Sequence, residues 1–214
     1  MNPSMESVKR REQSFSPLRD VTGVVLAGGR AQRMGGVDKG LVEIAGSKMI
    51  GHVLERLAPQ VRTVLINANR NLAEYGAFGF RVVSDRHADY PGPLAGFAAG
   101  MEAADTPFIV TVPCDSPLIV RNLVARLCAV AVERAADIVV AHDGSRLQPT
   151  FALLNRSLAG SLESYIGSGG RKIDRWYDAE GMETADCSDI AKSFANVNDP
   201  EERAAIEREM LRAG

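Results

Sequence analysis

A glycine-rich segment near the start of the chain combines flexible backbone with positive charge. In LAGGRAQRMGGVDKG, residues 26–40, five of fifteen residues are glycine, and Arg30, Arg33 and Lys39 lie among them. Bare backbone lets successive N–H groups converge on an anion, and a guanidinium and an ammonium can add full charges to it. We expect a phosphate site with a polyphosphate as ligand. The alternative is an ordinary flexible connection with solvated basic side chains.

Two familiar phosphate-binding motifs do not fit this segment. A P-loop needs a glycine directly before its lysine and Ser or Thr after it, whereas Lys39 lies between Asp38 and Gly40. The dinucleotide fingerprint G-x-G-x-x-G fails because Arg30 follows the pair Gly28–Gly29. The argument for phosphate therefore depends on backbone N–H groups and charge, not on a known motif.

Three polar residues follow other apolar stretches of the chain. Asp115 lies in VTVPCDSP, where its carboxylate could bind the divalent cation that accompanies a polyphosphate or could shape a turn. Combined with the glycine segment, it is expected to be a Mg²⁺ ligand. Asp85 in VVSDRHADYPGPLAG could accept from ribose hydroxyls or cap its turn. Asn67 in LINANR can donate and accept, as recognition of a base edge requires, or can simply begin a loop.

The elements that must position these residues alternate between apolar strands and amphipathic helices. Such alternation predicts one α/β domain, with a doubly wound, mainly parallel sheet covered on both faces. Ligands of such sheets bind beyond the carboxyl ends of strands, near the reversal of strand order. Strands are expected at 21–27, 61–68, 80–85, 107–113, 137–142 and 150–155, and helices at 48–58, 94–104, 119–136 and 198–211.

Composition excludes several classes of protein. The 214 residues are 45% apolar with a net charge of −2, which does not favour a nucleic-acid footprint. No stretch approaches the ~20 apolar residues of a membrane span. Cys114, Cys128 and Cys187 are odd in number and lack Cys-x-x-Cys spacing, which excludes a disulfide framework and a structural zinc site and favours a reducing cytoplasm.

The first nineteen residues differ from the rest. MNPSMESVKRREQSFSPLR is polar, carries three consecutive basic residues and lacks the apolar run of a secretory signal. We expect residues 1–19 to be a disordered extension and residues 20–214 to form the domain, with a targeting or docking arm as the alternative for the extension.

Six segments follow one another along the chain: LAGGRAQRMGGVDKGL, VVSDRHADYPGPLAG, VPCDSP, QPTFALL, GGRKIDRW and FANVNDPEE. In this order they resemble the successive motifs of the molybdenum cofactor guanylyltransferases. The first motif is shared with the wider nucleotidyltransferase superfamily, while MGGVDKG with ADYPGPLAG and FANVNDPEE is more specific. The resemblance implies a Rossmann-like nucleotidyltransferase fold. It also implies a reaction in which GTP and the phosphate of molybdenum-molybdopterin give the guanine dinucleotide cofactor and pyrophosphate.

The same resemblance assigns roles to individual residues. Arg33, Lys39 and Asp115 would be catalytic, with Asp115 acting through Mg²⁺. Cofactor insertion proteins and apo-molybdoenzymes would be protein partners. Gln32 departs from the family, which often has a basic residue there. The implied nucleotide-binding residues are Leu26, Ala27, Gly28, Gly29, Lys39, Asn67, Asp85 and Asp115. The implied pterin-side residues are Gly92, Pro93, Arg171, Lys172, Asn196 and Asn198.

Two other functions fit the residues. A related nucleotidyltransferase that uses CTP or UTP would hold its triphosphate in the same way. A non-catalytic carrier of a nucleotide or of the finished cofactor is the alternative from another class. A carrier has little use for a carboxylate–metal centre beside the phosphates, so Asp115 favours the enzyme.

Overall fold

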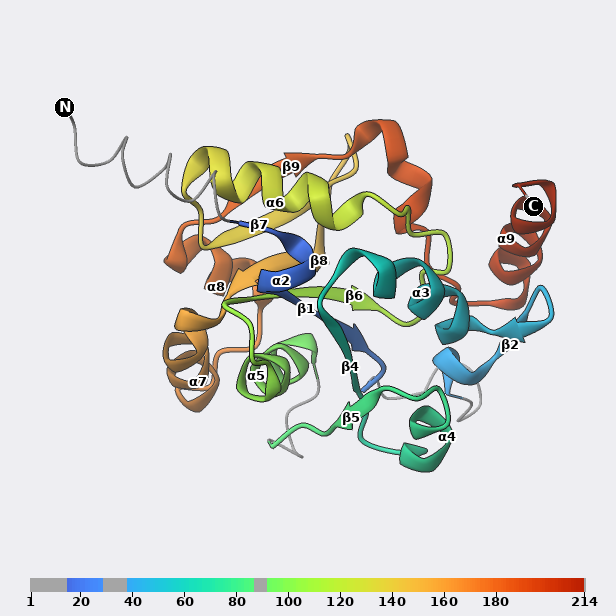
Figure 1. Cartoon of the computed structure of the whole chain (residues 1–214), viewed down its shortest axis with the longest axis horizontal. Coiled ribbons are helices and arrows are strands. Elements are labelled where there is room, and N and C mark those ends of the chain that lie inside the picture. The colour runs from blue at the N-terminus through green and yellow to red at the C-terminus, as the bar shows by residue number, and fades with distance from the viewer. Residues whose placement is uncertain (1–14, 29–37, 87–91, 214) are drawn as a thin grey trace.

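A seven-stranded sheet forms the centre of the structure, a computed structural model that describes residues 15–28, 38–86 and 92–213 (Figure 1). The strand order is β5-β4-β1-β6-β8-β7-β9, and neighbouring strands are parallel except where β8 pairs with β6 and β7. The mainly parallel α/β sheet predicted from the sequence is confirmed. The strands are β1 (Val21–Leu26), β4 (Thr63–Asn67), β5 (Arg81–Val83), β6 (Phe108–Pro113), β7 (Ile138–His142), β8 (Leu147–Asn155) and β9 (Glu183–Asp186).

The order of the strands reverses between β1 and β6. From β1 the chain proceeds outward to β4 and β5, then returns to place β6 on the other side of β1. Leu26, the last residue of β1, pairs with Asn67 at the end of β4 and with Pro113 at the end of β6. The loops after these three strands therefore begin side by side at one edge of the sheet, where ligands of such sheets bind.

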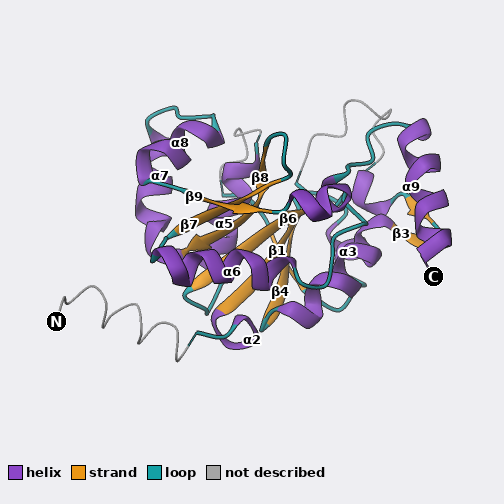
Figure 2. Cartoon of the chain, turned by 90° about the horizontal axis from the view of Figure 1, so that it is seen from above, coloured by secondary structure: helices purple, strands orange, loops and turns teal. Residues whose placement is uncertain are grey.

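Helices cover both faces of the sheet, as Figure 2 shows for α6 on one side and α5 on the other. Successive residues of β1 divide between the two layers, with Val25 in the core beneath α3 and α6 and Val24 in the core against α5. This alternation is the period of two that a strand imposes. The first layer contains α3 (Met49–Leu57) and α6 (Leu123–Arg134), and the second contains α5 (Pro93–Ala103), α7 (Ala159–Gly167) and α8 (Ile173–Glu180).

Helix α3 confirms the most regular pattern in the sequence. Its predicted apolar face is completely or almost completely buried, and burial of each such side chain is worth about 1.5–3 kcal/mol at most. The face consists of Met49, Ile50, Val53, Leu54 and Leu57. Helix α6 is shorter than predicted, because the side chain of Gln60 replaces an earlier helical bond: the N–H of Val124 donates to Oε1 of Gln60 at 3.0 Å, and the carbonyl of Val120 accepts from Nε2 of Gln60 at 3.0 Å.

Helix α5 lies unusually close to β1 because glycines face the strand. A Cβ atom on Gly100 would lie 2.8 Å from a methyl group of Val24, and one on Gly96 would lie 2.8 Å from a methyl group of Leu26 and 2.5 Å from Oδ1 of Asn67. All three distances are shorter than those that a real Cβ atom shows. The small-residue pattern of this helix is therefore a condition for its position against the end of β1.

Several short elements were not predicted from the sequence. They include the helix α4 (Leu72–Gly76), a two-stranded hairpin of β2 (Glu43–Ile44) and β3 (Ser47–Lys48), the helices α7 and α8, and the edge strand β9. Short 3-10 turns are also present at η2 (Lys39–Leu41), η3 (Ala58–Gln60), η4 (Arg156–Leu158) and η5 (Ser188–Phe194).

The last helix, α9 (Pro200–Ala213), begins two residues after the start predicted from the sequence. The Asp199 carboxylate accepts from the backbone N–H groups of Glu201 and Glu202 at 2.9 and 2.8 Å. The Glu202 carboxylate accepts from the N–H of Asn198 at 2.7 Å, one residue earlier than in a standard capping box. The helix then packs Ile206 against a small core near the β2–β3 hairpin, in which Ile44, Met49 and Val197 are buried.

The predicted extension, residues 1–19, overlaps the described part of the chain at residues 15–19, and its disorder stays a prediction. The short helix α2 (Pro17–Asp20) precedes β1, and the ring of Phe15 meets that of Phe108 edge-on, with 5.4 Å between the ring centroids. Phe15 gains apolar contact from this packing, which the polar composition of the segment did not indicate. Residues 1–14 lie outside the described part of the chain.

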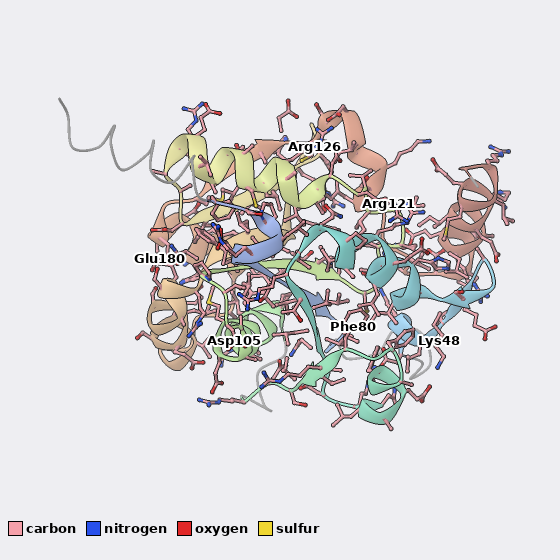
Figure 3. All side chains as sticks on the ribbon, viewed as in Figure 1. Lys48, Phe80, Asp105, Arg121, Arg126 and Glu180 are labelled. Atoms are coloured by element: carbon pink, nitrogen blue, oxygen red, sulfur yellow. The ribbon has the colours of Figure 1, made fainter. Side chains whose placement is uncertain are left out.

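Charged side chains surround the two cores (Figure 3). Arg126 of α6 donates two hydrogen bonds to the carboxylate of Asp189, at 2.8 and 2.7 Å, and so fastens η5 to α6.

Among the described residues, no helix is both long enough and apolar enough to cross a membrane.

Candidate functional site

A cluster of polar side chains lies beyond the ends of β4 and β5. Asn67 donates from Nδ2 to Oδ1 of Asp85 at 2.8 Å, and Asn69 donates from Nδ2 to Oδ2 of Asp85 at 2.7 Å. The N–H of Asp85 donates in turn to Oδ1 of Asn69 at 2.9 Å. Both oxygens of the Asp85 carboxylate are thereby held, and the side chain is fixed in one orientation. We call Asn67, Asn69 and Asp85 the base-side cluster.

The amide oxygen of Asn67 faces glycine backbone on two sides. Its nitrogen donates to acceptors only, the Asp85 carboxylate and, at 3.4 Å, the carbonyl of Val83, which fixes the orientation of the amide. Oδ1 then lies 3.2 Å from the place of a Cβ on Gly28 and 2.5 Å from that on Gly96. Any side chain at either glycine would crowd this oxygen, and Asn67 is only 2% exposed.

A second cluster lies beyond the end of β6. The ammonium of Lys39 donates to Oδ2 of Asp115 at 3.2 Å and to Oδ1 of Asn198 at 2.6 Å. The two charged side chains are about a quarter and a sixth exposed, so solvent screens the ion pair and its main effect is on position. We call Lys39, Asp115 and Asn198 the phosphate-side cluster.

The segment before α9 runs along the loop after β6 and holds this cluster in place. The N–H of Val197 donates to the carbonyl of Asp115 at 3.0 Å. The hydroxyl of Ser116, which is completely buried, donates to Oδ1 of Asn196 at 2.5 Å. Asn196 and Asn198, predicted as pterin-side residues, are thus brought to Asp115 and Lys39.

The two clusters flank the end of β1. Asn67 and Pro113 each pair with Leu26, and strands are about 4.8 Å apart, so the starts of the two loops are separated by about 10 Å. The N–H of Ala27 donates to the carbonyl of Asn67 at 2.8 Å, and the carbonyl of Leu26 accepts from the N–H of Cys114 at 3.1 Å. The predicted contacts of Leu26, Ala27 and Gly28 with a nucleotide stay predictions, but all three residues lie between the clusters.

The remaining predicted site residues lie partly outside the described residues and partly in other elements of the fold. Gly29 and Arg33 lie outside the described residues. Gly92 and Pro93 form the start of α5, one turn before Gly96 and therefore on the base side. Arg171 and Lys172 lie in the connection between α7 and α8. Arg171 donates to the carbonyls of Ile166 and Gly170, and the carbonyl of Lys172 accepts from the hydroxyl of Tyr165 in α7. Their predicted role toward a pterin is untested by these contacts.

Cys114, next to Asp115, is not a nucleophile. Burial raises the pKa of its thiol well above the ordinary value, and the negative charges of Asp115 and Asp38 raise it further, while Lys39 and a backbone hydrogen bond act in the opposite direction. The thiol is therefore protonated at neutral pH, when only a thiolate would attack. Its side chain is accordingly part of the buried core.

Sequence reasoning missed two residues of the site. Asn69 follows Asn67 by two positions, and a strand that continued through both would place them on one face. That spacing was the available signal. Asp38 precedes Lys39 and holds Tyr75, Asn71 and Arg70, but nothing in the local sequence indicates these partners.

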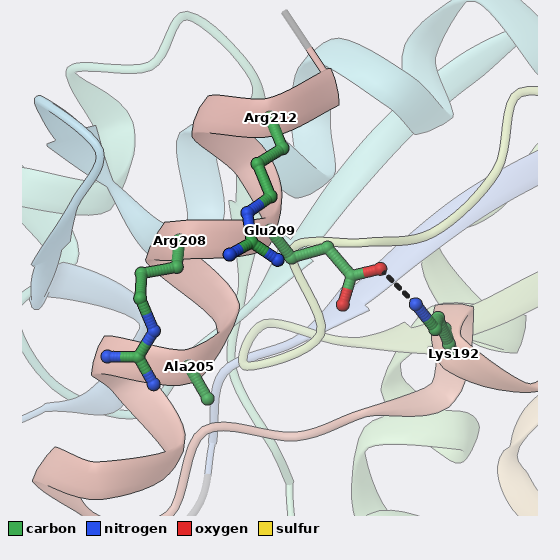
Figure 4. Close-up of a pocket in the computed structure, with 5 residues that line it drawn as sticks. All are labelled: Lys192, Ala205, Arg208, Glu209 and Arg212. Atoms are coloured by element: carbon green, nitrogen blue, oxygen red, sulfur yellow. Dashed lines mark hydrogen bonds and ion pairs between the residues drawn. The ribbon is translucent and has the colours of Figure 1, made fainter.

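A hollow of about 320 Å³ lies elsewhere, between η5 and α9 (Figure 4). Its lining contains no residue of either cluster, and Lys192 and Glu209 already bind each other across it at 2.7 Å. The hollow is lined by Lys192, Ala205, Arg208, Glu209 and Arg212.

Comparisons with known proteins identify relatives that match most of the chain. The molybdenum cofactor guanylyltransferases of Shewanella halifaxensis and Shewanella pealeana are 47% and 48% identical to the chain over 186 residues, which is 87% of this chain and 93% of each relative. The solved molybdopterin-guanine dinucleotide biosynthesis protein A from Archaeoglobus fulgidus shares the fold, with a TM-score of 0.76 at 22% identity over 89% of this chain and 99% of that one. A nucleotidyl transferase from Methanothermobacter has a TM-score of 0.72 at 19% identity, over 91% of this chain and 99% of its own. The family model of the MobA-like NTP transferase domain matches residues 23–182, and the chain belongs to this family.

Proposed function

We propose that the chain transfers GMP from GTP to the phosphate of molybdenum-molybdopterin, giving the guanine dinucleotide cofactor and pyrophosphate. The observation that carries the proposal is the pairing of Lys39 with Asp115 beyond β6, beside the base-side cluster at the reversal of strand order. The names of relatives that are nearly half identical over most of the chain support the same activity.

The phosphate-side cluster suits a reaction between two anions. Attack of one phosphate on another requires that their repulsion be offset before bonds change. The Lys39 ammonium, held at 3.2 and 2.6 Å by two oxygen atoms, provides a positive charge at a fixed place. Because the pterin phosphate is itself the nucleophile, the protein needs to supply only alignment and electrostatic stabilisation. Cys114 with its raised pKa takes no part.

Asp115 fits a Mg²⁺ ion bound mainly through the substrate. Among the described residues, no group of three or more His, Cys, Asp or Glu side chains converges as an all-protein metal cage would require. Mg²⁺ is usually held by one or two carboxylates together with substrate phosphates, and Asp115 offers one partly buried carboxylate. When bound, the ion would neutralise phosphate oxygens.

The base-side cluster offers acceptors and therefore favours guanine over cytosine. The N–H groups of the Asn67 amide donate to Asp85 and Val83. Oδ1 of Asn67 and the Asp85 carboxylate are left as acceptors. The pairing edge of guanine presents two adjacent donors, N1–H and the 2-amino group, whereas cytosine presents one amino group and two acceptors. The missing side chains of Gly28 and Gly96 leave the space that this oxygen occupies beside their backbone.

The test is a product analysis. The protein is incubated with Mg²⁺, molybdenum-loaded pterin and either GTP or CTP, and the product mass and released pyrophosphate are measured. We expect a guanine adduct and stoichiometric pyrophosphate with GTP only. A cytosine adduct would assign the chain to the CTP-using alternative, and bound nucleotide without pyrophosphate would assign it to the carrier alternative.

A variant tests the role of the phosphate-side cluster. We expect Lys39→Ala to lower turnover by roughly 10²–10³-fold, the range for loss of one preorganised charge-stabilising donor. Turnover within threefold of the unsubstituted protein would contradict this role.

A cytoplasmic location and delivery of the product to cofactor insertion proteins and apo-molybdoenzymes belong to the same proposal.

A further inference from the structure

Asp38 is a nearly buried carboxylate with donors on several sides. Its side chain is 6% exposed, and it accepts from the Tyr75 hydroxyl at 2.5 Å and from Nδ2 of Asn71 at 3.2 Å. Nε of Arg70 lies 3.5 Å from the same carboxylate. Burial of a carboxylate costs several kcal/mol unless such donors replace water. All three donors come from α4 and the residues just before it.

The backbone around Asp38 is fixed as firmly as its side chain. Its carbonyl accepts from the N–H of Leu41 at 3.0 Å and so opens the turn η2 that carries Lys39. Gly40 fits between Tyr75 and Cys114, because a Cβ there would lie 2.8 Å from the Tyr75 hydroxyl and 3.1 Å from Sγ of Cys114. The residues on both sides of Lys39 are therefore clamped against the body of the protein.

The Lys39 side chain needs such a clamp. It is long and a quarter exposed, and ordering a lysine side chain costs up to about 1.5–2 kcal/mol in rotamer entropy. Its solvent-screened bonds to Asp115 and Asn198 compete with this cost. A fixed Cα restricts where the ammonium can reach before any bond forms.

We propose that Asp38 and Tyr75 are positioning residues that place Lys39 for the reaction. Neither residue acts on the phosphates itself. The Tyr75–Asp38 hydrogen bond joins α4 to η2 and thereby sets the point from which the ammonium extends to Asp115. The inference rests on the proposed function, since it gives Lys39 the role described there.

The experiment compares two buried tyrosines. Tyr75→Phe removes only the hydroxyl that holds Asp38. Tyr177→Phe is the matched control, because Tyr177 is equally buried, belongs to the other helical layer and donates one hydroxyl hydrogen bond, at 2.8 Å, to the carbonyl of Pro149 in β8. Both variants are measured for thermal unfolding, for kcat and for KM with GTP.

We expect Tyr75→Phe to lower kcat by about 10- to 10²-fold, the effect of a misplacement near 1 Å at a reacting centre, with KM for GTP changed less than threefold. We expect Tyr177→Phe to keep kcat within twofold and to lower the temperature of thermal unfolding by about as much as Tyr75→Phe does. Equal kcat values for the two variants would overturn the inference.

A double variant separates positioning from general loss of structure. If Tyr75 acts through Lys39, adding Tyr75→Phe to Lys39→Ala lowers turnover less than twofold further, because the group being positioned is already gone. Multiplying effects would overturn the inference. Asp38→Asn keeps the shape and an acceptor for Tyr75, so it should retain more activity than Asp38→Ala, and equal activities would also contradict the proposal.

The same set of variants distinguishes failure of this inference from failure of the proposed function. If Lys39→Ala alone leaves turnover unchanged, the role of Lys39 fails and the inference fails with it. If Lys39→Ala is slow while Tyr75→Phe matches Tyr177→Phe, the proposed function stands and the inference alone is wrong.

Discussion

Substitution of Gly96 by alanine tests whether the Asn67 oxygen contacts the base. The added Cβ would lie 2.5 Å from Oδ1 of Asn67 and must gain about 0.9 Å to reach the 3.4 Å of ordinary contact. Asn67 cannot retreat freely, because its amide is held by Asp85 at 2.8 Å and its carbonyl by Ala27. The substitution therefore displaces the amide by a sizeable part of 1 Å.

The cost in stability should be small compared with the cost in function. Alanine improves a helix interior over glycine by about 1 kcal/mol, whereas overpacking costs about 1–3 kcal/mol. The net loss in the free energy of unfolding is then about 0–2 kcal/mol. A misplacement near 1 Å at a binding group can cost about 10²-fold, so we expect kcat/KM for GTP to fall by 10- to 10²-fold.

The control is Gly100→Ala in the same helix. Its Cβ would meet Val24 at 2.8 Å, which gives similar overpacking away from Asn67. GTP affinity by calorimetry, kcat/KM and thermal unfolding are measured for both variants. Equal GTP affinities within threefold would refute the assignment of the Asn67 oxygen to the base.

Three further substitutions have defined outcomes. Asp115→Asn should lower turnover by about 10²-fold and weaken its dependence on Mg²⁺, and an unchanged Mg²⁺ titration would contradict the metal role. Asn69→Ala should raise the Kd for GTP by about 10-fold, because Asp85 loses a hydrogen bond of a kind usually worth about 1.5–3 kcal/mol; calorimetry with unaltered affinity would show that Asp85 needs no such support. The N–H groups of Arg146 and Ser145 and the Gln148 amide lower the pKa of Asp143, so its contribution to stability is complete above the ordinary carboxylate pKa and is lost as the pH falls through the lowered value. Asp143→Asn should accordingly lower Tm at pH 7, with a difference that narrows below about pH 4; a Tm difference that stays constant down to pH 2 would contradict this.

Elements with a strong apolar period could be predicted from the sequence. The face of α3 and the runs of β1, β4 and β6 are dictated by burial, and each appears where the pattern places it. Strand β9 could not be predicted, because Glu183–Asp186 has no apolar pattern and is held by pairing with β7. The antiparallel direction of β8 was equally hidden, since a buried strand has the same composition in either direction.

Some residues of the site could likewise be predicted from the sequence, whereas the residues that support them could not. Lys39, Asn67, Asp85 and Asp115 lie at or beyond the carboxyl ends of predicted strands, so the rule that ligands bind at carboxyl ends was enough to select them as candidates. The support of Lys39 was not accessible, because the Tyr75–Asp38 bond joins residues 37 positions apart through the unpredicted helix α4. Residues that touch a ligand can be inferred from their place on a sheet, whereas their supports depend on tertiary contacts.

The hydrogen bond between Lys39 and Asn198 also has a consequence for biosynthesis. It joins residues 159 positions apart, and the strand that precedes Lys39 is among the first parts of the domain to be made. Domains generally fold as units during synthesis, yet the phosphate-side cluster cannot close until the chain has been made through Asn198. A nascent chain can hence contain β1, β4, β5 and β6 well before Asn198 can reach Lys39.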